Sequence, residues 1–154
     1  MNTELQIESP EVSVERLPIS ARTVLVDLGT VRAVLGLDTV GVLKRVELGH
    51  LQWVFDFGQT SRGAKVASGK RELRFWVREI IAPEQCAHLN LAQAVMQIVG
   101  ADISIRRTEL ERRWVVSHVT VFRWIRDREI YLFGRSEIAR QSLADFLMKR
   151  HYAG

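Results

Sequence analysis

The apolar positions in the first part of the chain follow a pattern that recurs in the last part. Segment 37–46 falls on segment 116–125 with its apolar positions in register, although few residues are identical. The matched pairs are Val31 and Leu110, Leu35 and Trp114, Leu37 and Val116, Val42 and Val121, Val46 and Ile125, and Leu51 and Ile130. Two copies are too few for a solenoid, which needs about three stacked units. The pattern therefore predicts a tandem pair of one small motif.

The second copy carries the signals of two short helices. Residues 108–111 have the form of a capping box, in which the hydroxyl of Thr108 would accept a hydrogen bond from a free backbone amide at the helix start. Leu110 and Trp114 follow four residues apart and give this helix one apolar stripe. Ser117 is a good N-cap for a second helix. That helix places three apolar residues on one face: Val121, Trp124 and Ile125.

The opposite face of this second helix includes two arginines. It carries Val119, Phe122, Arg123 and Arg126, with His118 and Thr120 at its flanks. Two short helices around a tight turn, the second with an exposed basic face, are typical of a helix-turn-helix. A β wing is predicted after them, with strands at 130–133 and 137–139. Ser142 is then expected to cap a last helix.

The first copy is looser but has the same signals. Asp38 is the expected cap of its second helix, and Gly49 stands where a C-terminal capping glycine is expected. Its wing is longer, with strands predicted at 51–57 and 71–76. The loop between these strands, 58–70, is rich in glycine and basic residues, and loops of this length are usually functional or disordered.

The segment between the copies has its own helical signals. Residues 77–81 are predicted to form a short helix that Pro83 ends, and Asn90 begins a helical pattern that Gly100 closes. We therefore expect an acidic N-terminal segment at 1–19, a first module at 20–83 and a second at 84–154. The predicted fold is mainly α with small β wings, as tandem winged helix-turn-helix modules. Since no long Gly/Ser linker separates the modules, we expect them to pack together.

Composition then narrows the class of protein. The 154 residues are 47% hydrophobic and 26% charged, a usual globular mix, which excludes a disordered tail, a collagen-like fibre and a coiled-coil rod. No apolar run is long enough to span a membrane, and the first ten residues lack the apolar stretch of a secretory signal. Cys86, the one cysteine, cannot form an internal disulfide, so we expect a reducing cytoplasm.

Charge is distributed unevenly along the chain. The net charge is −3 over residues 1–29, +3 over 30–85 and +4 over 86–154. An acidic start and a basic remainder fit a protein that meets a polyanion such as nucleic acid. A solvated surface with a high isoelectric point is the plainer alternative.

The residues of the second copy also resemble a known family. Segment 110–127 is similar to the winged helix-turn-helix of excisionase-type proteins, relatives of the MerR regulators, with the family string L-A-x-x-x-x-V-S-x-x-T-V-x-R-x-I. The similarity extends over about 104–150, and 28–57 resembles the same module more weakly. Glu111 stands where the family has a small residue, and 128–130 replaces the usual glycine-containing start of the wing.

The resemblance implies a compact domain that binds double-stranded DNA. Its second helix would enter the major groove, and its wing would touch the minor groove or the backbone. Family members act as excisionases, which bend DNA and direct a recombinase, or as small transcription regulators, and the sequence leaves both roles open. We therefore expect double-stranded DNA as partner, with a recombinase or other protein and a homo-oligomer as further options, in a cytoplasmic, nucleoid-associated setting.

Candidate DNA contacts follow from side-chain chemistry and position. Arginine is the side chain that most often hydrogen-bonds to guanine O6 and N7. In helix-turn-helix proteins, residues near the start of the second helix contact base edges and phosphates. Residues of a wing contact phosphates or the minor groove. The candidates are Ser117, His118, Thr120, Phe122, Arg123, Arg126 and Arg135 in the second copy, and Thr39, Lys44, Arg45, Arg62 and Lys65 in the first. The plainer alternatives are a solvated basic face for Arg123 and Arg126, and packing under the wing for Phe122.

Other chemistry has little support in the sequence. Cys86 and His88 lack the paired ligands of a structural zinc site, and no phosphate-binding glycine loop occurs. We expect no enzymatic activity and no metal or organic cofactor. The second hypothesis is a protein-interaction adaptor built on winged-helix scaffolds, since a fold does not dictate function. A continuous basic surface favours DNA binding, whereas an exposed apolar patch favours the adaptor.

Overall fold

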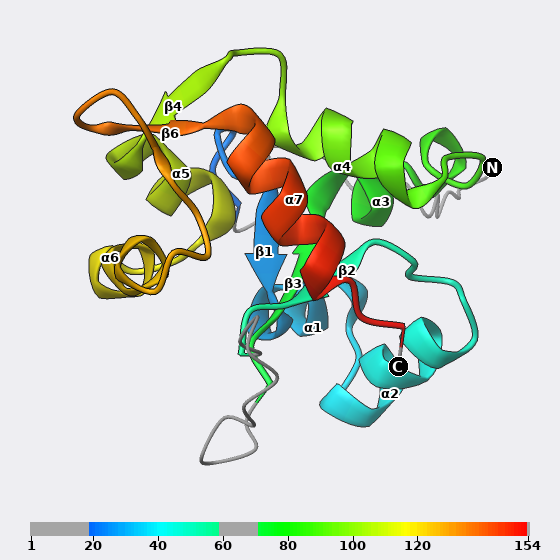
Figure 1. Ribbon diagram of the computed structural model, residues 1–154. Coiled ribbons are helices and arrows are strands. Elements are labelled where there is room, and N and C mark those ends of the chain that lie inside the picture. Colours follow the sequence, from blue (N-terminus) through cyan, green and yellow to red (C-terminus); the bar gives the residue numbers. More distant parts are fainter. Residues whose placement is uncertain (1–18, 59–70, 154) are drawn as a thin grey trace, which may run out of the picture.

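The computed structural model describes residues 19–58 and 71–153, which form seven α-helices and two small antiparallel sheets (Figure 1). The protein is thus a mixed structure of helices with small sheets. The first half contains β1 (Leu25–Asp27), α1 (Leu28–Leu35), α2 (Thr39–Glu47), β2 (Val54–Asp56), β3 (Leu73–Trp76) and α3 (Val77–Ile81). A 3-10 turn at Pro83–Gln85 and α4 (Leu91–Val99) follow. The second half contains β4 (Ser104–Arg106), α5 (Arg107–Trp114), α6 (His118–Arg126), β5 (Leu132–Phe133), β6 (Glu137–Ala139) and α7 (Arg140–Arg150).

The two halves have the same order of elements. Their first strands begin at Leu25 and Ser104, their first helices at Leu28 and Arg107, and their second helices at Thr39 and His118, always with the same separation along the chain. The strand order is also the same, β1-β3-β2 in one sheet and β4-β6-β5 in the other, with every pair antiparallel. The apolar repeat in the sequence therefore corresponds to a repeated arrangement of strands and helices.

Several predicted helix caps are confirmed. The side chain of Asp38 accepts a hydrogen bond from Gly41 N, and that of Ser117 accepts one from Thr120 N. Asn90 forms a complete capping box at the start of α4. Gly49 lies just after α2 with φ of +80°, a left-handed conformation that glycine adopts at little cost. At these three helix starts a short polar side chain satisfies a free amide locally, as predicted.

Two predicted caps are wrong. Helix α5 begins at Arg107 and has no side-chain cap, so Thr108 lies inside the helix. Helix α7 begins at Arg140, also without a cap, and the buried hydroxyl of Ser142 instead accepts a hydrogen bond from Tyr131 N at 2.8 Å. Both helices follow directly from a strand, β4 or β6. Neither strand end provides the separate capping residue that the sequence patterns suggested.

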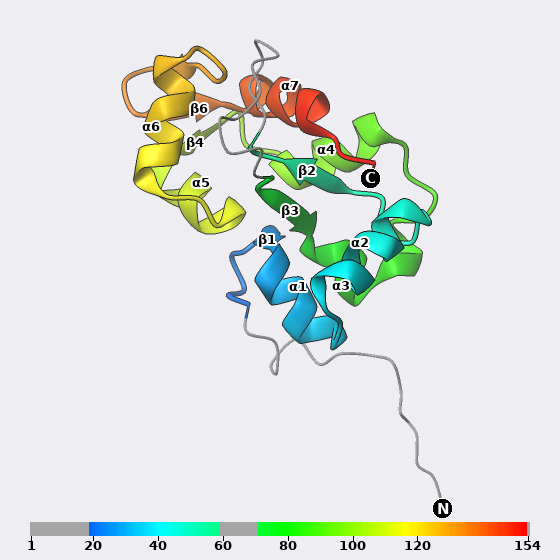
Figure 2. The same ribbon diagram turned by 90° about the horizontal axis from the view of Figure 1, so that it is seen from below.

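The sheet of the first half is buried on both faces. Val26, Val54 and Phe75 lie on one face and join the core formed with α1, α2 and α3. Leu25, Phe55 and Trp76 lie on the other face, in a core shared with the second half. Figure 2 shows these strands between α1–α3 on one side and α4 and α7 on the other. The predicted first wing therefore has buried strands, because the second half covers the face that a wing would expose.

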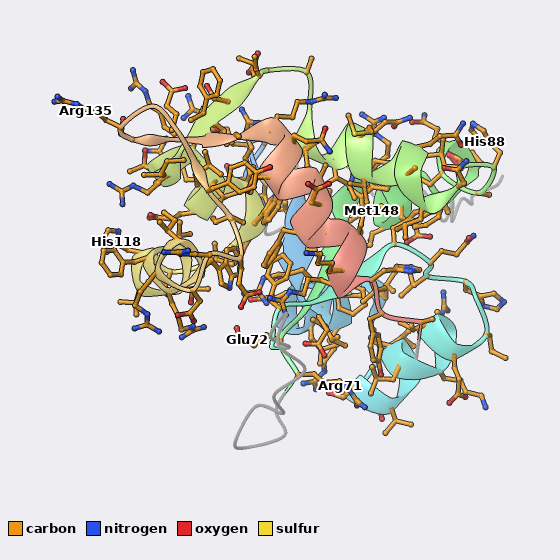
Figure 3. The ribbon with its side chains drawn as sticks, in the orientation of Figure 1. Arg71, Glu72, His88, His118, Arg135 and Met148 are labelled. Atoms are coloured by element: carbon orange, nitrogen blue, oxygen red, sulfur yellow. The ribbon has the colours of Figure 1, made fainter. Side chains whose placement is uncertain are left out.

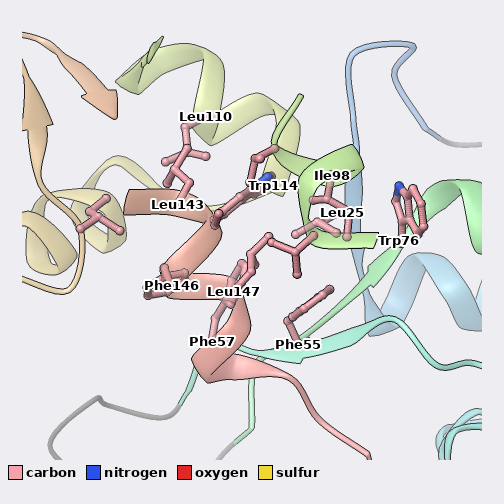
Figure 4. Packing of buried hydrophobic residues seen from close by; sticks show 14 of the residues in the cluster. Leu25, Phe55, Phe57, Trp76, Ile98, Leu110, Trp114, Leu143, Phe146 and Leu147 are labelled. Atoms are coloured by element: carbon pink, nitrogen blue, oxygen red, sulfur yellow. The ribbon is translucent and has the colours of Figure 1, made fainter. Parts of the chain in front are cut away.

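Phe57 joins the cores of the two halves. It follows β2, yet its ring lies 5.6 Å from Trp114, 5.1 Å from Trp124 and 5.6 Å from Phe146, measured between centroids. Figure 4 shows it beside Phe146 and Leu147 of α7. The two halves thus pack together, as the absence of a long linker suggested, and one aromatic cluster contains residues of both.

The C-terminal residues close one edge of the first sheet. His151 forms a β-bridge with Phe55, and Tyr152 N donates to Val54 O at 2.8 Å. Within residues 19–58 and 71–153, no helix is long and apolar enough to cross a membrane.

Candidate nucleic-acid interface

Helix α6 presents one face to the core and the other to solvent. It buries Val121 and Trp124, which pack in the shared core. Its exposed side chains are His118, Val119, Phe122, Arg123 and Arg126. These residues occupy one face at helical spacing, as the sequence predicted. Phe122 is 53% exposed, so it is not packed under the neighbouring strands.

The three cationic or titratable side chains on this face differ in their partners. The guanidinium of Arg123 makes no hydrogen bond or ion pair within the described residues. Arg126 donates from Nε to Asp127 at 3.0 Å, and this hydrogen bond raises the pKa of its guanidinium. Nδ1 of His118 lies 3.5 Å from Glu111 Oε2. Arg123 is therefore the cation on this face that is most available to an external anion.

Ser117 and Thr120 form the N-terminal cap of α6. Ser117 Oγ accepts a hydrogen bond from Thr120 N at 3.1 Å, and the two hydroxyls lie 2.9 Å apart. Their oxygens are thus already engaged in the cap. The structure gives these two residues a clear structural role, in addition to the contact role that we predicted for them.

The β5–β6 turn carries a second available cation. Arg135 follows Gly134, whose φ of +79° allows the tight turn, and it is exposed without a hydrogen bond or ion pair among the described residues. Figure 3 shows Arg135 at the turn and His118 at the start of α6 extending from the same side of the molecule. Arg106 and Arg128, which the sequence analysis did not select, are exposed cations of the same half.

The candidates in the first half differ in their availability. Thr39 is half-buried, and Lys44 Nζ lies 3.6 Å from Glu47 Oε1. Arg45 is exposed. Glu47 is the counterpart of Arg126 in the repeat, so α2 has an acidic residue where α6 has a basic one. Arg62 and Lys65 lie outside the described residues.

The turn between α5 and α6 is held by the first half. Arg74 of β3 is 8% exposed and donates from Nε to Trp114 O at 3.0 Å and from Nη2 to Val115 O at 2.6 Å. Val24 N donates to Arg113 O at 2.7 Å. The last carbonyls of a helix lack intrahelical partners, so residues of the first half satisfy those of α5. Burial lowers the pKa of the Arg74 guanidinium, and Glu72 and Asp27 counteract this effect.

Sequence analysis missed Arg74 as a functional candidate. Leu73 and Phe75 alternate with Arg74 and Trp76, a pattern that indicates a half-exposed strand with Arg74 in solvent. Trp76 lies on the same face of the strand as Arg74, and such a large apolar side chain could have indicated that this face is buried. Only the packing of the second half revealed that Arg74 contacts the α5–α6 turn.

Val115 in this turn has a conformation that disfavours its side chain. Its φ is +52°, which is rare for a β-branched residue, whereas the equivalent Gly36 after α1 has φ of +66°. We expect Val115→Gly to raise the free energy of unfolding by about 0.5–1 kcal/mol, because the left-handed strain exceeds the entropic cost of glycine. Gly36→Val, where no atom would obstruct a Cβ, should lower it by about 1–2 kcal/mol. Urea unfolding monitored by tryptophan fluorescence measures the stability of both variants. A Val115→Gly variant that is less stable than the wild-type protein would contradict the expected strain at Val115.

A cluster of metal ligands and a reactive thiol are both absent from the described residues. They contain no group of three or more His, Cys, Asp or Glu side chains placed to hold a metal ion. Burial raises the pKa of the Cys86 thiol to about 11, so this thiol is protonated at neutral pH and is a poor ligand and nucleophile. The neighbouring His88 is exposed. The exposed cations of α6 and of the β5–β6 turn define the candidate site.

Comparisons with known proteins give no assignment. No protein-family model matches the chain, and no curated protein or solved structure matches it significantly.

Proposed function

We propose that this protein binds double-stranded DNA through α6 and the β5–β6 turn of its second half. Each half would be a winged helix-turn-helix, with α5 and α6 as the helix pair of the second. The observation that carries the proposal is the exposed, unpaired guanidinium of Arg123 on a helix that the protein core holds in place. The exposed Arg135 on the same side of the molecule supports it.

In this proposal α6 lies in the major groove, which has the width to accept a helix. Arg123 contacts a guanine edge or a phosphate, and Arg135 meets the backbone or the minor groove beside it. The contacts from Arg74 and Val24 to the end of α5 fix the turn from which α6 extends. The family resemblance supports a role in transcription regulation or in directing a recombinase, within the nucleoid.

The test is fluorescence anisotropy of a labelled mixed-sequence duplex, titrated at several salt concentrations. We expect binding that weakens with salt, because each neutralised phosphate contributes about 0.9 to the slope of log affinity against log salt. If Arg123 contacts a phosphate, Arg123→Ala should reduce the slope by about one such unit. If it contacts a base, the affinity for a preferred site should fall by about 1–3 kcal/mol.

The repeat supplies a matched control for this variant. Lys44 is the counterpart of Arg123 in the first copy and lies on α2, outside the proposed surface, so Lys44→Ala should leave affinity and slope nearly unchanged. Equal losses in the two variants would mean that binding does not depend on α6 in particular. Absence of binding by the wild-type protein at low salt would overturn DNA binding itself.

A protein-interaction adaptor is the second candidate, because apolar side chains are exposed near the same site. Val119, Phe122, Tyr131 and Phe133 are each at least half exposed, at 68%, 53%, 55% and 50%. Exposed apolar patches often mark protein–protein contacts. This candidate predicts no salt-dependent binding to duplex DNA, so the anisotropy titration discriminates between the two functions.

A further inference from the structure

Helix α6 exposes two apolar side chains beside its available arginine. Val119 is 68% exposed and Phe122 is 53% exposed. Residues three and four apart are neighbours on a helix surface, so Val119, Phe122 and Arg123 form one continuous patch. The aromatic ring of Phe122 has no ring or cation contact among the described residues. The patch therefore combines a free cation with a free apolar surface.

These apolar residues are not needed by the core of the second half. Helix α6 already places Val121 and Trp124 there, at 1% and 2% exposure. The equivalent helix α2 also exposes a valine, Val40, but the residue equivalent to Phe122 is Leu43, which is half-buried. The exposed aromatic side chain thus distinguishes the proposed DNA-contacting helix from its counterpart in the first half.

The major groove offers a specific partner for such side chains. Phosphates and most base-edge groups are polar, whereas the 5-methyl group of thymine is apolar and projects into the major groove. Phenylalanine and small aliphatic groups contact this methyl group in protein–DNA complexes. A helix that presents Val119 and Phe122 together with Arg123 therefore matches a groove segment that contains thymine beside guanine.

We infer that Val119 and Phe122 recognise thymine methyl groups, so that the preferred DNA sites of this protein contain A·T pairs next to the pair that Arg123 contacts. This inference rests on the proposed function and adds the sequence class of the target. It assigns Phe122 a role in specificity, while Arg123 provides charge and a polar contact.

Selection followed by base replacement tests the inference. The full chain first selects its preferred sequences from a library of random duplexes, and the best of these is then prepared with deoxyuridine in place of thymine. This replacement removes only the methyl groups. We expect A·T pairs to be enriched, and each contacted methyl group to contribute about fourfold to affinity, equivalent to ~0.8 kcal/mol.

Protein variants then link the effect to particular side chains. Phe122→Ala and Val119→Ala remove exposed atoms, so the fold should remain intact, which a thermal melt verifies. Each variant should reduce the affinity ratio between the thymine and deoxyuridine duplexes, whereas Val40→Ala, the equivalent of Val119→Ala in the first half, should leave this ratio unchanged. Arg123→Ala should weaken binding to both duplexes and leave most of the ratio intact.

Two results would overturn the proposals separately. Equal affinity of the wild-type protein for the selected duplex with thymine and with deoxyuridine would refute recognition of methyl groups, while leaving DNA binding in place. Failure to select any duplex would refute the proposed DNA binding, and the exposed apolar patch would then favour the adaptor.

Discussion

Replacing Phe57 by alanine is expected to lower the free energy of unfolding by about 3–5 kcal/mol. The ring is 4% exposed and lies against Trp114, Trp124 and Phe146. Removing it would leave a cavity between rigid rings that can collapse only partly, and the surrounding atoms would lose their dispersion contacts. Because Phe57 belongs to the first half and its neighbours to the second, the loss should weaken the packing of the halves as well.

Urea unfolding measures this effect through tryptophan fluorescence and far-ultraviolet circular dichroism together. Coincident transitions by the two probes are expected in the wild-type protein, since one of its two cores contains residues of both halves. Phe133→Ala is the matched control, because that ring is 50% exposed and its removal should change stability by at most about 0.5 kcal/mol. A loss below about 1 kcal/mol for Phe57→Ala would show that the cluster is not central to stability.

Breaking the buried ion pair between Arg150 and Glu129 should have an effect of similar size. Their side chains are 2% and 6% exposed, and the Arg150 guanidinium also lies 4.6 Å from the centre of the Phe146 ring. Burial lowers the pKa of Arg150, and nearby Asp56 opposes that effect. Arg150→Met leaves the carboxylate of Glu129 buried without its cation, so we expect a loss of about 3–5 kcal/mol.

A double-mutant cycle separates the pair from simple packing. Replacing both residues by methionine removes both charges, and such apolar replacement of a buried pair is often neutral or stabilising. The double variant should therefore be more stable than Arg150→Met alone, with a coupling energy of about 1–3 kcal/mol. Additive losses would indicate that Arg150 acts mainly through its contact with Phe146 or Asp56.

Local signals in the sequence predicted most of the helices. Asp38, Asn90 and Ser117 mark helix starts because a short polar side chain satisfies a free amide without help from the rest of the fold. The helix at 77–81 and the strand at 137–139 also lie where the sequence predicted them. The predictions at Thr108 and Ser142 failed because these helices begin earlier, after Arg106 and Ala139, and neither of those residues makes a side-chain cap.

The strands were less predictable than the helices. The short strands β1 and β4 were missed, since such brief segments show little alternation. Their pairing partners lie far along the chain, because Leu25 pairs with Trp76 in the first sheet and Ser104 pairs with Ala139 in the second. Such pairing is a tertiary contact that no local pattern records.

At the candidate site, too, the sequence predicted the local features and missed the contacts between side chains. Helical spacing was sufficient to place Phe122, Arg123 and Arg126 on one exposed face, because the burial of Val121 and Trp124 fixes the opposite one. It was not sufficient to show that Asp127 pairs with Arg126 or that Glu47 pairs with Lys44. Whether a cationic side chain is free to bind an anion depends on which neighbouring side chains reach it. These neighbours differ between α2 and α6, although the two helices have similar apolar patterns.

The sequence by itself thus determined the repeated motif, the caps of α2, α4 and α6, and the polar and apolar faces of α6, since these depend on interactions within a few residues. The tertiary structure decided that the second half covers the sheet of the first. It also decided that Phe57 completes an aromatic core beyond its own half, and that Arg74 binds the carbonyls of the α5–α6 turn. These contacts join residues at least 40 positions apart. They form only when both halves have folded, because the free carbonyls at the end of α5 and the aromatic cavity around Phe57 do not exist before then.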